Sequence, residues 1–339
     1  MRWQVCAFLV SIVAVVGGGI VISGDAPGRG ASRESYRRPA AIPYPDDNPY
    51  SAEKAELGRT LFFDPILSGS RTRSCGSCHN PSLSWGDGLP RAIGEGNAAL
   101  PLRSPTLLAI AWIPRLGWDG KFRDLESVAF GPITSPTNMN LPEAALMKRL
   151  QAIPDYVSAF ETAFGPDGIT RRNVELALAT FQRSIVVGQT PFDNWVEGDE
   201  QAINAAAKRG FELFNGKARC SGCHNGFAFS DGSFHDIGTA TDADVGRGRL
   251  FPTSLKLRYA FKTPTLRDVA RRAPYMHDGS VPTLAGVIDL YDRGGIERPS
   301  RSVLIRPLEL TQAEKADLVE FLNTLTALQR PISHRVPPR

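Results

Sequence analysis

Cys75-Gly76-Ser77-Cys78-His79 returns later in the chain as Cys220-Ser221-Gly222-Cys223-His224. A Cys-x-x-Cys-His sequence is the attachment signature of c-type haem, because the two thiols bond to the two vinyl groups and the adjacent imidazole binds the iron. Two copies therefore predict two covalently bound haem c groups, attached through Cys75, Cys78, Cys220 and Cys223, with His79 and His224 as the proximal iron ligands. The alternative is a zinc site of four cysteines, which requires the two pairs to meet in space and leaves both histidines without a role.

The sequence around the two motifs is repeated as well. A helix pattern over residues 55–62 precedes the first motif, and a similar pattern over 207–214 precedes the second. Farther along, Ser104-Pro105-Thr106-Leu107 is matched by Thr263-Pro264-Thr265-Leu266. At the same distance beyond each proline come Trp118-Asp119-Gly120 and His277-Asp278-Gly279. An internal repeat of this length indicates two related domains, whose positions can be compared one by one.

The rest of the chain consists mainly of helix patterns. Apolar residues recur at helical spacing over 142–151, 154–164, 170–187 and 311–328, whereas no run shows the alternation of a strand. We therefore expect an all-α fold. An acidic stretch that contains glycine, Glu197–Glu200, precedes the second copy. We predict a first haem domain over 49–197, a second over 198–330, and a short tail over 331–339.

The N-terminal region predicts export. Residues 1–25 hold a nearly continuous apolar run from Val5 to Ile22, which is typical of a secretory signal. The alternative is a permanent anchor, because about 18 apolar residues can just span a bilayer. In both cases the rest of the chain is exported, so we expect a periplasmic protein that contacts a membrane only if the leader is not cleaved. The stretch 26–48 is rich in Pro, Gly and Arg without an apolar period, and it predicts a flexible tether.

The charge and the cysteine count of the chain argue against a nucleic-acid partner and against disulfides. The 39 basic and 35 acidic residues give a net charge of only +4 with no basic block, which argues against a nucleic-acid partner. Of the five cysteines, Cys6 lies in the leader and the other four form the two motifs. No cysteine is left for a disulfide.

Together, these motifs make the sequence similar to the bacterial dihaem cytochrome c peroxidases and their MauG-like relatives. The resemblance covers residues 50–329 and depends on the two haem motifs, on Trp118-Asp119-Gly120 and on Ala273–Ser280 (APYMHDGS). It implies that each half is a cytochrome c-like helical domain. It also implies that the first haem reacts with hydrogen peroxide and that the second haem has ligands on both faces of its iron.

The same resemblance assigns the distal ligand of the second haem. The peroxidases have a methionine at the position of Tyr291, and MauG-like proteins have a tyrosine there. The internal repeat supports the assignment independently, because laying His277 on Trp118 puts Tyr291 on Pro132, a side chain that cannot bind iron. We therefore expect Tyr291 to be the distal ligand of the second haem iron. The first haem iron, beside Pro132, should have a free distal coordination position. The alternative for Tyr291 is an ordinary half-buried aromatic residue of the helix pattern 284–291.

Other positions agree less well with the family. Trp118, which lies between the haems in the family, is expected to be the electronic bridge; the alternative is a plain core tryptophan. The family's catalytic glutamate is replaced by Asn138, its distal glutamine by Val128, and the removable distal histidine of the peroxidases by Glu95. Because an amide cannot relay a proton, Asn138 leaves the acid–base step without its usual group. Glu95 is either a second carboxylate for that step or a solvated loop residue.

The resemblance also implies a calcium ion between the domains. Its asparagine ligand corresponds here to Ser104 and its threonine carbonyl to Arg272, while Pro274 is retained. Carbonyl groups are then the ligands that the chain could still offer to the ion.

Tyr291 separates two functions, because a phenolate favours oxidised iron whereas a thioether raises the reduction potential. We expect an exported oxidoreductase that uses hydrogen peroxide at the open haem and withdraws electrons through the second haem from a protein substrate. The first alternative is removal of hydrogen peroxide with a small redox protein as electron donor. The second is a non-enzymatic electron carrier, which the missing glutamate at Asn138 favours.

Overall fold

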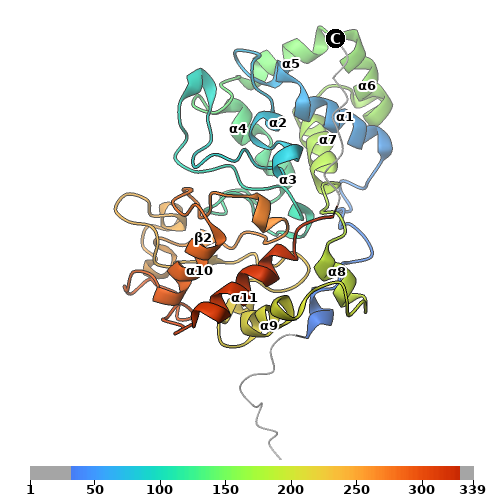
Figure 1. Ribbon diagram of the computed structural model, residues 1–339. Coiled ribbons are helices and arrows are strands. Elements are labelled where there is room, and N and C mark those ends of the chain that lie inside the picture. Colours follow the sequence, from blue (N-terminus) through green and yellow to red (C-terminus); the bar gives the residue numbers. More distant parts are fainter. Residues whose placement is uncertain (1–31, 329–339) are drawn as a thin grey trace, which may run out of the picture.

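The computed structural model describes residues 32–328 and shows two helical lobes, one above the other in Figure 1. Strand is limited in this part of the chain to one antiparallel pair of two-residue strands, β1 (Phe234–His235) and β2 (Phe261–Lys262). The predicted helical fold with two domains is therefore confirmed. The predicted leader (1–25) and tail (331–339) lie outside the described residues. Between residues 32 and 328, no helix is long and apolar enough to cross a bilayer.

The first domain, the upper lobe, is built on two long helices that pack against each other, α1 (Ala52–Phe63) and α7 (Arg171–Arg183). Leu57 and Leu61 of α1 lie one turn apart and share the core with Val174 and Leu178 of α7. Five shorter helices complete the lobe: α2 (Cys75–Cys78), α3 (Leu125–Val128), α4 (Phe130–Thr134), α5 (Glu143–Gln151) and α6 (Pro154–Phe164). The helices predicted over 142–151 and 154–164 are confirmed, and the one predicted over 170–187 ends earlier, at Arg183.

The second domain repeats the plan with α9 (Ala205–Asn215) packed against α11 (Gln312–Asn323). The Thr311 hydroxyl caps α11 and the Glu314 carboxylate bonds back, as the predicted capping box requires. Two more helices belong to this lobe, α8 (Pro191–Val196) and α10 (Leu284–Arg293). Phe192 and Trp195 of α8 are buried in the second core. The core of the second domain therefore begins before the predicted boundary at 197/198.

A glycine at the same place in each copy lets the paired helices approach closely. A Cβ on Gly58 of α1 would lie 1.9 Å from the carbonyl oxygen of Ala177, and one on Gly210 of α9 would lie 2.0 Å from that of Asp317. No real Cβ tolerates such a contact, so both crossings require glycine. The internal repeat therefore extends from the sequence to the packing of the helices.

The backbone repeats its unusual conformations as well. Ala109 and the equivalent Asp268 both have a φ of +57°, in the left-handed region that costs a side-chain-bearing residue roughly 1–2 kcal/mol. Gly120 and Gly279 match in the same way, with φ values of +69° and +70°. The segments between these pairs, which carry Trp118 and His277, are therefore held in equivalent positions.

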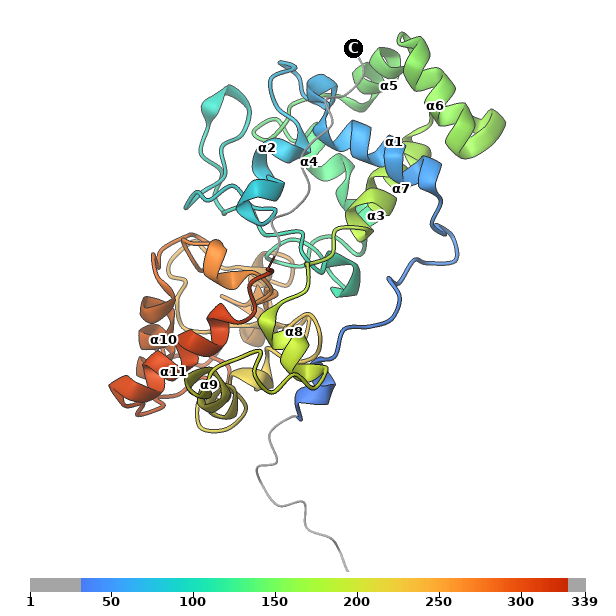
Figure 2. The same cartoon turned by 45° about the vertical axis from the view of Figure 1, so that its right-hand side comes forward.

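The stretch predicted as a flexible tether is ordered where the structure describes it. Residues 32–48, which we name the N-terminal strap, run beside both lobes in Figure 2. Tyr36 is fully buried in the second core and stacks on Phe229, with ring centroids 4.7 Å apart. Asn48 is fully buried in the first domain and donates to Glu126. The prediction of flexibility is wrong for this part, because isolated anchors such as Tyr36 and Asn48 need no apolar period.

Candidate haem sites

The first Cys-x-x-Cys-His motif forms a short helix beside the core of the first domain. Ser74 begins α2, and Ser77 completes a capping box, so that Cys75 and Cys78 lie on one turn and His79 ends it. The Nδ1 atom of His79 lies 3.3 Å from the carbonyl oxygen of Trp85. Because a carbonyl can only accept, this contact places the proton on Nδ1 and leaves Nε2 with a lone pair. Burial lowers the pKa of His79, which favours the neutral, ligating imidazole.

The second motif has the same chemistry on a tighter turn. Cys220 begins a short 3₁₀ helix, and His224 follows with its Nδ1 atom 2.8 Å from the carbonyl oxygen of Phe229. Burial again lowers the pKa of the imidazole. Both motifs therefore offer two free thiols and a neutral histidine whose Nε2 is available, which is the donor set that a haem c requires.

A large cavity extends from the second motif to the interface between the domains. About 1890 Å³ inside it, including its opening to solvent, is not filled by protein atoms. Cys220, Cys223 and His224 form part of its wall, and most of the rest is apolar. The residues present therefore fit a covalently bound haem.

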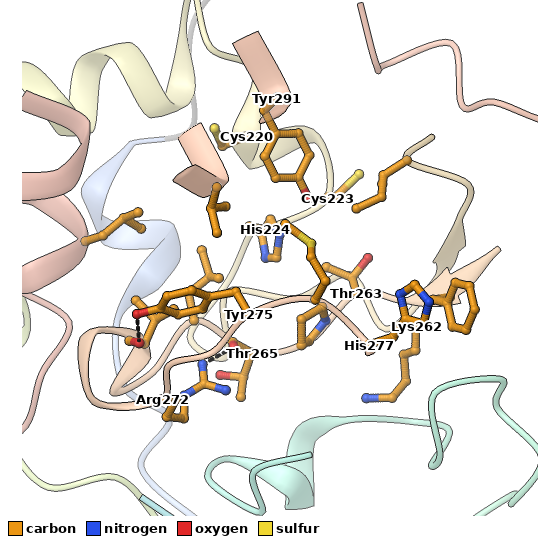
Figure 3. Close-up of a pocket in the computed structure, with 18 of the residues that line it drawn as sticks. Cys220, Cys223, His224, Lys262, Thr263, Thr265, Arg272, Tyr275, His277 and Tyr291 are labelled. Carbon is orange, nitrogen blue, oxygen red and sulfur yellow. Dashed lines mark hydrogen bonds between the residues drawn. The ribbon is translucent and has the colours of Figure 1, made fainter. Parts of the chain in front are cut away.

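Tyr291 enters this cavity from α10. In Figure 3 its ring lies over the part of the cavity that holds His224 and Cys223. Its hydroxyl group has no hydrogen-bond partner within residues 32–328, and burial raises the pKa of the phenol. Tyr291 is half-buried, and its ring lines the cavity. The free hydroxyl beside His224 is therefore suited to a ligand role.

Another candidate ligand of the same wall is already engaged. The Nε2 atom of His277 lies 2.7 Å from Oδ2 of Asp244, and its ring stacks on Phe261 at a centroid distance of 3.8 Å. Tyr275 also lines the cavity, but its hydroxyl group donates to the carbonyl oxygen of Val269. Compared with these side chains, Tyr291 is the one whose donor atom is unused.

Pro132 and Asn138 lie on one turn of the first domain. Pro132 is part of α4, and its carbonyl oxygen accepts the amide of Met139, the residue after Asn138. The backbone N–H of Asn138 donates to Ser135, whereas its side chain makes no hydrogen bond within the described range 32–328. The structure thus brings these two predicted distal residues together.

Glu95 reaches the same turn from another loop. Its backbone N–H donates to the carbonyl oxygen of Asn138 at 2.7 Å, and its Oε1 accepts the amide of Ser70. The other carboxylate oxygen, Oε2, is buried without a hydrogen-bond partner. The same loop lies against the attachment helix, since the carbonyl oxygen of Ile93 is 3.9 Å from Sγ of Cys78. Glu95 is therefore a half-buried residue near the first motif, with one of its carboxylate oxygens shielded from solvent.

Trp118 lies where the two domains meet and contacts its own repeat equivalent. The rings of Trp118 and His277 are 6.4 Å apart at an interplanar angle of 70°. The backbone repeats this reciprocity, because Lys262 donates its N–H to Trp118 at 2.8 Å and the equivalent Arg103 donates its N–H to His277 at 3.0 Å. Reciprocal contacts of this kind indicate an approximate two-fold relation between the domains. Trp118 also lines the cavity of the second motif.

Three basic side chains of the cavity wall were not predicted from the sequence as charged groups of the site: Arg103, Lys262 and Arg272. Burial lowers the pKa of Lys262 to about 8 and that of Arg272 to about 10. None of the three forms an ion pair with a carboxylate within residues 32–328. A signal was present, because Arg103 and Lys262 each directly precede the repeated Ser/Thr-Pro-Thr-Leu.

Asp231 and His235 lie beside Cys223 and resemble part of a metal site. Nε2 of His235 is 2.8 Å from Oδ2 of Asp231, a hydrogen bond that raises the pKa of the imidazole. The sulfur of Cys223 is the third member of this group, and the haem motif already uses it. The pair is therefore better described as an ion pair at the edge of the second haem site.

Comparisons with known proteins agree with this geometry. Residues 52–201 match the family model of di-haem cytochrome c peroxidase, and residues 207–326 match that of cytochrome c. The chain is 50% identical over 299 residues to the methylamine utilization protein MauG of Methylorubrum extorquens, covering 88% of this chain and 85% of that protein. It is 34% identical over 328 residues to the cytochrome-c peroxidase IdrP1 of Pseudomonas sp. strain SCT, covering 87% of this chain and 86% of that protein.

A solved structure shows the same arrangement. A MauG-like protein associated with microbial copper homeostasis superposes with a TM-score of 0.80 and 32% identity, over 86% of this chain and 95% of that one. Both the sequence relatives and this structure span the two lobes together. The chain is therefore an oxidoreductase with two haem c groups, and it belongs to the family of di-haem cytochrome c peroxidases and MauG.

Proposed function

We propose that the chain oxidises a protein substrate with hydrogen peroxide, as a MauG-type member of the family. The observation that carries this proposal is the unpartnered hydroxyl of Tyr291 in the cavity of His224. A phenolate ligand stabilises oxidised iron and so suits a haem that draws electrons from a substrate. The MauG relatives of Methylorubrum extorquens and Methylophilus methylotrophus, at 50% and 45% identity, support the same type.

The two haems would supply the redox chemistry, in which one hydrogen peroxide takes up two electrons and two protons and becomes two waters. A protein substrate that loses two electrons and two protons balances this reaction. The thioether bonds of Cys75 and Cys78, with His79 on the proximal face, would hold the haem of the first domain. Pro132 offers no ligand atom, so peroxide would have access to the distal face.

The residues between the two sites would couple them. Trp118 extends from the first domain to the cavity of the second motif and contacts His277 there. An aromatic side chain in this place suits the transfer of single electrons between the haems. Asn138 would position peroxide by hydrogen bonding but would not carry its proton. Proton delivery is therefore the step in which this chain departs most from the family pattern.

Two other functions remain distinguishable by experiment. A peroxidase that takes its electrons from a small redox protein is supported by the relatives named cytochrome-c peroxidase. A carrier without peroxide chemistry is supported by the amide at Asn138 alone. We infer a periplasmic location for all three, from the predicted leader.

The decisive experiment starts from the holoprotein. Mass spectrometry should find two covalently attached haems. Incubation with peroxide and the exported proteins of the same cell should then leave one of them with an oxidised Trp or Tyr, while reduced cytochrome c is turned over slowly. Fast turnover of reduced cytochrome c with no modified protein would establish the peroxidase instead, and no reaction with peroxide at all would establish the carrier.

A further inference from the structure

We propose that the guanidinium group of Arg103 takes the place of the calcium ion that family resemblance implies between the domains, so that this chain joins its two haem domains without a metal. The proposal concerns the interface around Arg103 and Arg272 and does not depend on the reaction that the haems perform.

The carbonyl group that would bind calcium is occupied by a cation of the chain itself. The Nη2 atom of Arg103 donates to the carbonyl oxygen of Arg272 at 3.0 Å. A hydrogen bond from a charged donor in a low-dielectric setting is about twice as strong as a neutral one. Arg103 comes from the first domain and Arg272 from the second, so this bond connects the domains directly.

The side chain at the asparagine position is a short hydroxyl group directed at a carboxylate. The hydroxyl group of Ser104 donates to Oδ2 of Asp87 at 2.8 Å. Calcium requires six to eight oxygen ligands at 2.3–2.6 Å, and a serine at this position does not supply the amide oxygen that the family resemblance assigns to the ion. The cation on the Arg272 carbonyl and the missing amide oxygen therefore both argue against a calcium ion here.

The positive charges at this interface also oppose the binding of calcium. Arg103 and Arg272 are neighbouring cations, and their Nε atoms are both buried without a hydrogen-bond partner. Neither forms an ion pair with a carboxylate in the described part of the chain. A divalent ion beside these two guanidinium groups would be repelled, whereas Arg103 already donates to the Arg272 carbonyl.

The backbone around Arg103 supports a structural role at this interface. Its N–H group donates to the carbonyl oxygen of His277 at 3.0 Å, so the residue crosses the interface with both backbone and side chain. Lys262, its repeat equivalent, makes the matching backbone bond to Trp118. In Figure 3 Lys262 and Arg272 lie on the side of the cavity nearest the first domain. Lys262 therefore offers a matched control, a second cation at the equivalent place that does not bind the Arg272 carbonyl.

The test compares the wild-type holoprotein with Arg103→Asn and Lys262→Met. Each is loaded with excess calcium chloride or treated with the chelator EGTA, desalted, and measured for metal content, thermal midpoint and haem absorption spectrum. Wild type should hold no calcium and should show the same midpoint and spectrum in both conditions. Arg103→Asn removes the guanidinium and adds an amide oxygen. It should lose roughly 5 °C in EGTA, regain it with calcium, and bind one ion.

The control variant and the calcium content of the wild type distinguish the possible outcomes. Lys262→Met should remain insensitive to calcium, because the Arg272 carbonyl stays occupied. Calcium in stoichiometric amount in the wild type, or a change of its spectrum in EGTA, would overturn the proposal. An Arg103→Asn variant that is destabilised but not restored by calcium would overturn it as well. Should that variant fail to fold, Arg103→Lys, which keeps the charge, must behave as wild type, and the calcium content of the wild type still decides.

Discussion

Tyr291 and Tyr275 are two tyrosines on the wall of one cavity, and their hydroxyl groups differ in one respect. Tyr275 donates to the carbonyl oxygen of Val269 at 3.1 Å, whereas Tyr291 has no partner within residues 32–328. Tyr291→Phe should therefore open the second iron while both haems stay attached, because thioether bonds do not depend on the sixth ligand. Electronic absorption and electron paramagnetic resonance should show a change from low spin to high spin.

Tyr275→Phe is the matched control and should leave the spin state unchanged. If Tyr291→Phe also leaves the spectrum of the second haem unaltered, the ligand is another group of the wall, such as His277 or Met276. His277 would then have to give up its bond to Asp244.

We expect Asn138 to limit the rate of peroxide cleavage at the first site, because an amide cannot deliver a proton. General acid–base assistance contributes about 10²- to 10⁴-fold in rate, so Asn138→Glu should accelerate the reaction with peroxide by a large part of that factor. Stopped-flow mixing of the oxidised protein with peroxide measures it. Asn138→Gln keeps the amide and should not accelerate the reaction.

A fast reaction of the wild-type protein with peroxide would contradict this expectation. Glu95 would then be the candidate proton donor. Its Oε2 is buried without a partner, and its backbone is bonded to Asn138. In that event Glu95→Gln should slow the wild-type reaction, whereas it should have little effect if the wild type is slow.

At the scale of helices, Gly58 and Gly210 fix the two crossings on which the lobes are built. Gly210→Ala would place a Cβ 2.0 Å from the carbonyl oxygen of Asp317 and push α9 away from α11. Overpacking of this kind costs about 1–3 kcal/mol, so the free energy of unfolding of the second domain should fall by that amount. Urea unfolding followed by the absorption of the second haem measures it.

Glu212→Ala, at an exposed position of the same helix, serves as control and should change stability by less than about 0.5 kcal/mol. Gly58→Ala should have the same effect on the first domain, through the carbonyl oxygen of Ala177. Unchanged stability in both glycine variants would show that the helices can separate without loss of packing.

The elements that sequence patterns predict well are those whose signal is local. The helices over 142–151 and 154–164 follow from apolar spacing, and the Thr311 cap follows from a side chain three residues before its partner. The close contacts of Gly58 and Gly210 join residues far apart in sequence, so no local pattern reveals them. Both copies carry a glycine at the same place, and only the packing of the helices shows what that glycine does.

The residues of the candidate site can also be separated into those with a local sequence signal and those without one. The thiols and proximal histidines follow from a five-residue motif, and Tyr291 follows from the repeat together with the family resemblance. The burial of Lys262 and the engagement of His277 by Asp244 depend on how one lobe faces the other. Physical properties of this kind, above all the shifted pKa of a buried cation, arise only after the domains have docked.

At the scale of the whole molecule, the two domains are joined by reciprocal contacts around Trp118 and His277 and by the N-terminal strap. The strap is anchored in the second domain by Tyr36, which donates to Oδ1 of Asn215, and by Arg38, which pairs with the buried Asp193. It enters the first domain at Asn48. A segment with few apolar residues can thus hold two lobes together through a small number of buried, hydrogen-bonded groups.

Tyr36 is the anchor whose loss should be measurable. Tyr36→Ala would leave a cavity among Phe192, Phe211 and Phe229, which surround the ring, and removal of a buried aromatic side chain costs about 3–5 kcal/mol. The second domain should unfold at a lower urea concentration, while the first keeps most of its stability because its own core is untouched. Tyr36→Phe removes only the hydrogen bond to Asn215 and should cost about 1 kcal/mol. Unfolding followed separately at the two haems distinguishes the outcomes: equal losses in both domains would mean that the strap couples the lobes into one cooperative unit, and no loss in either would mean that the strap contributes nothing to the second core.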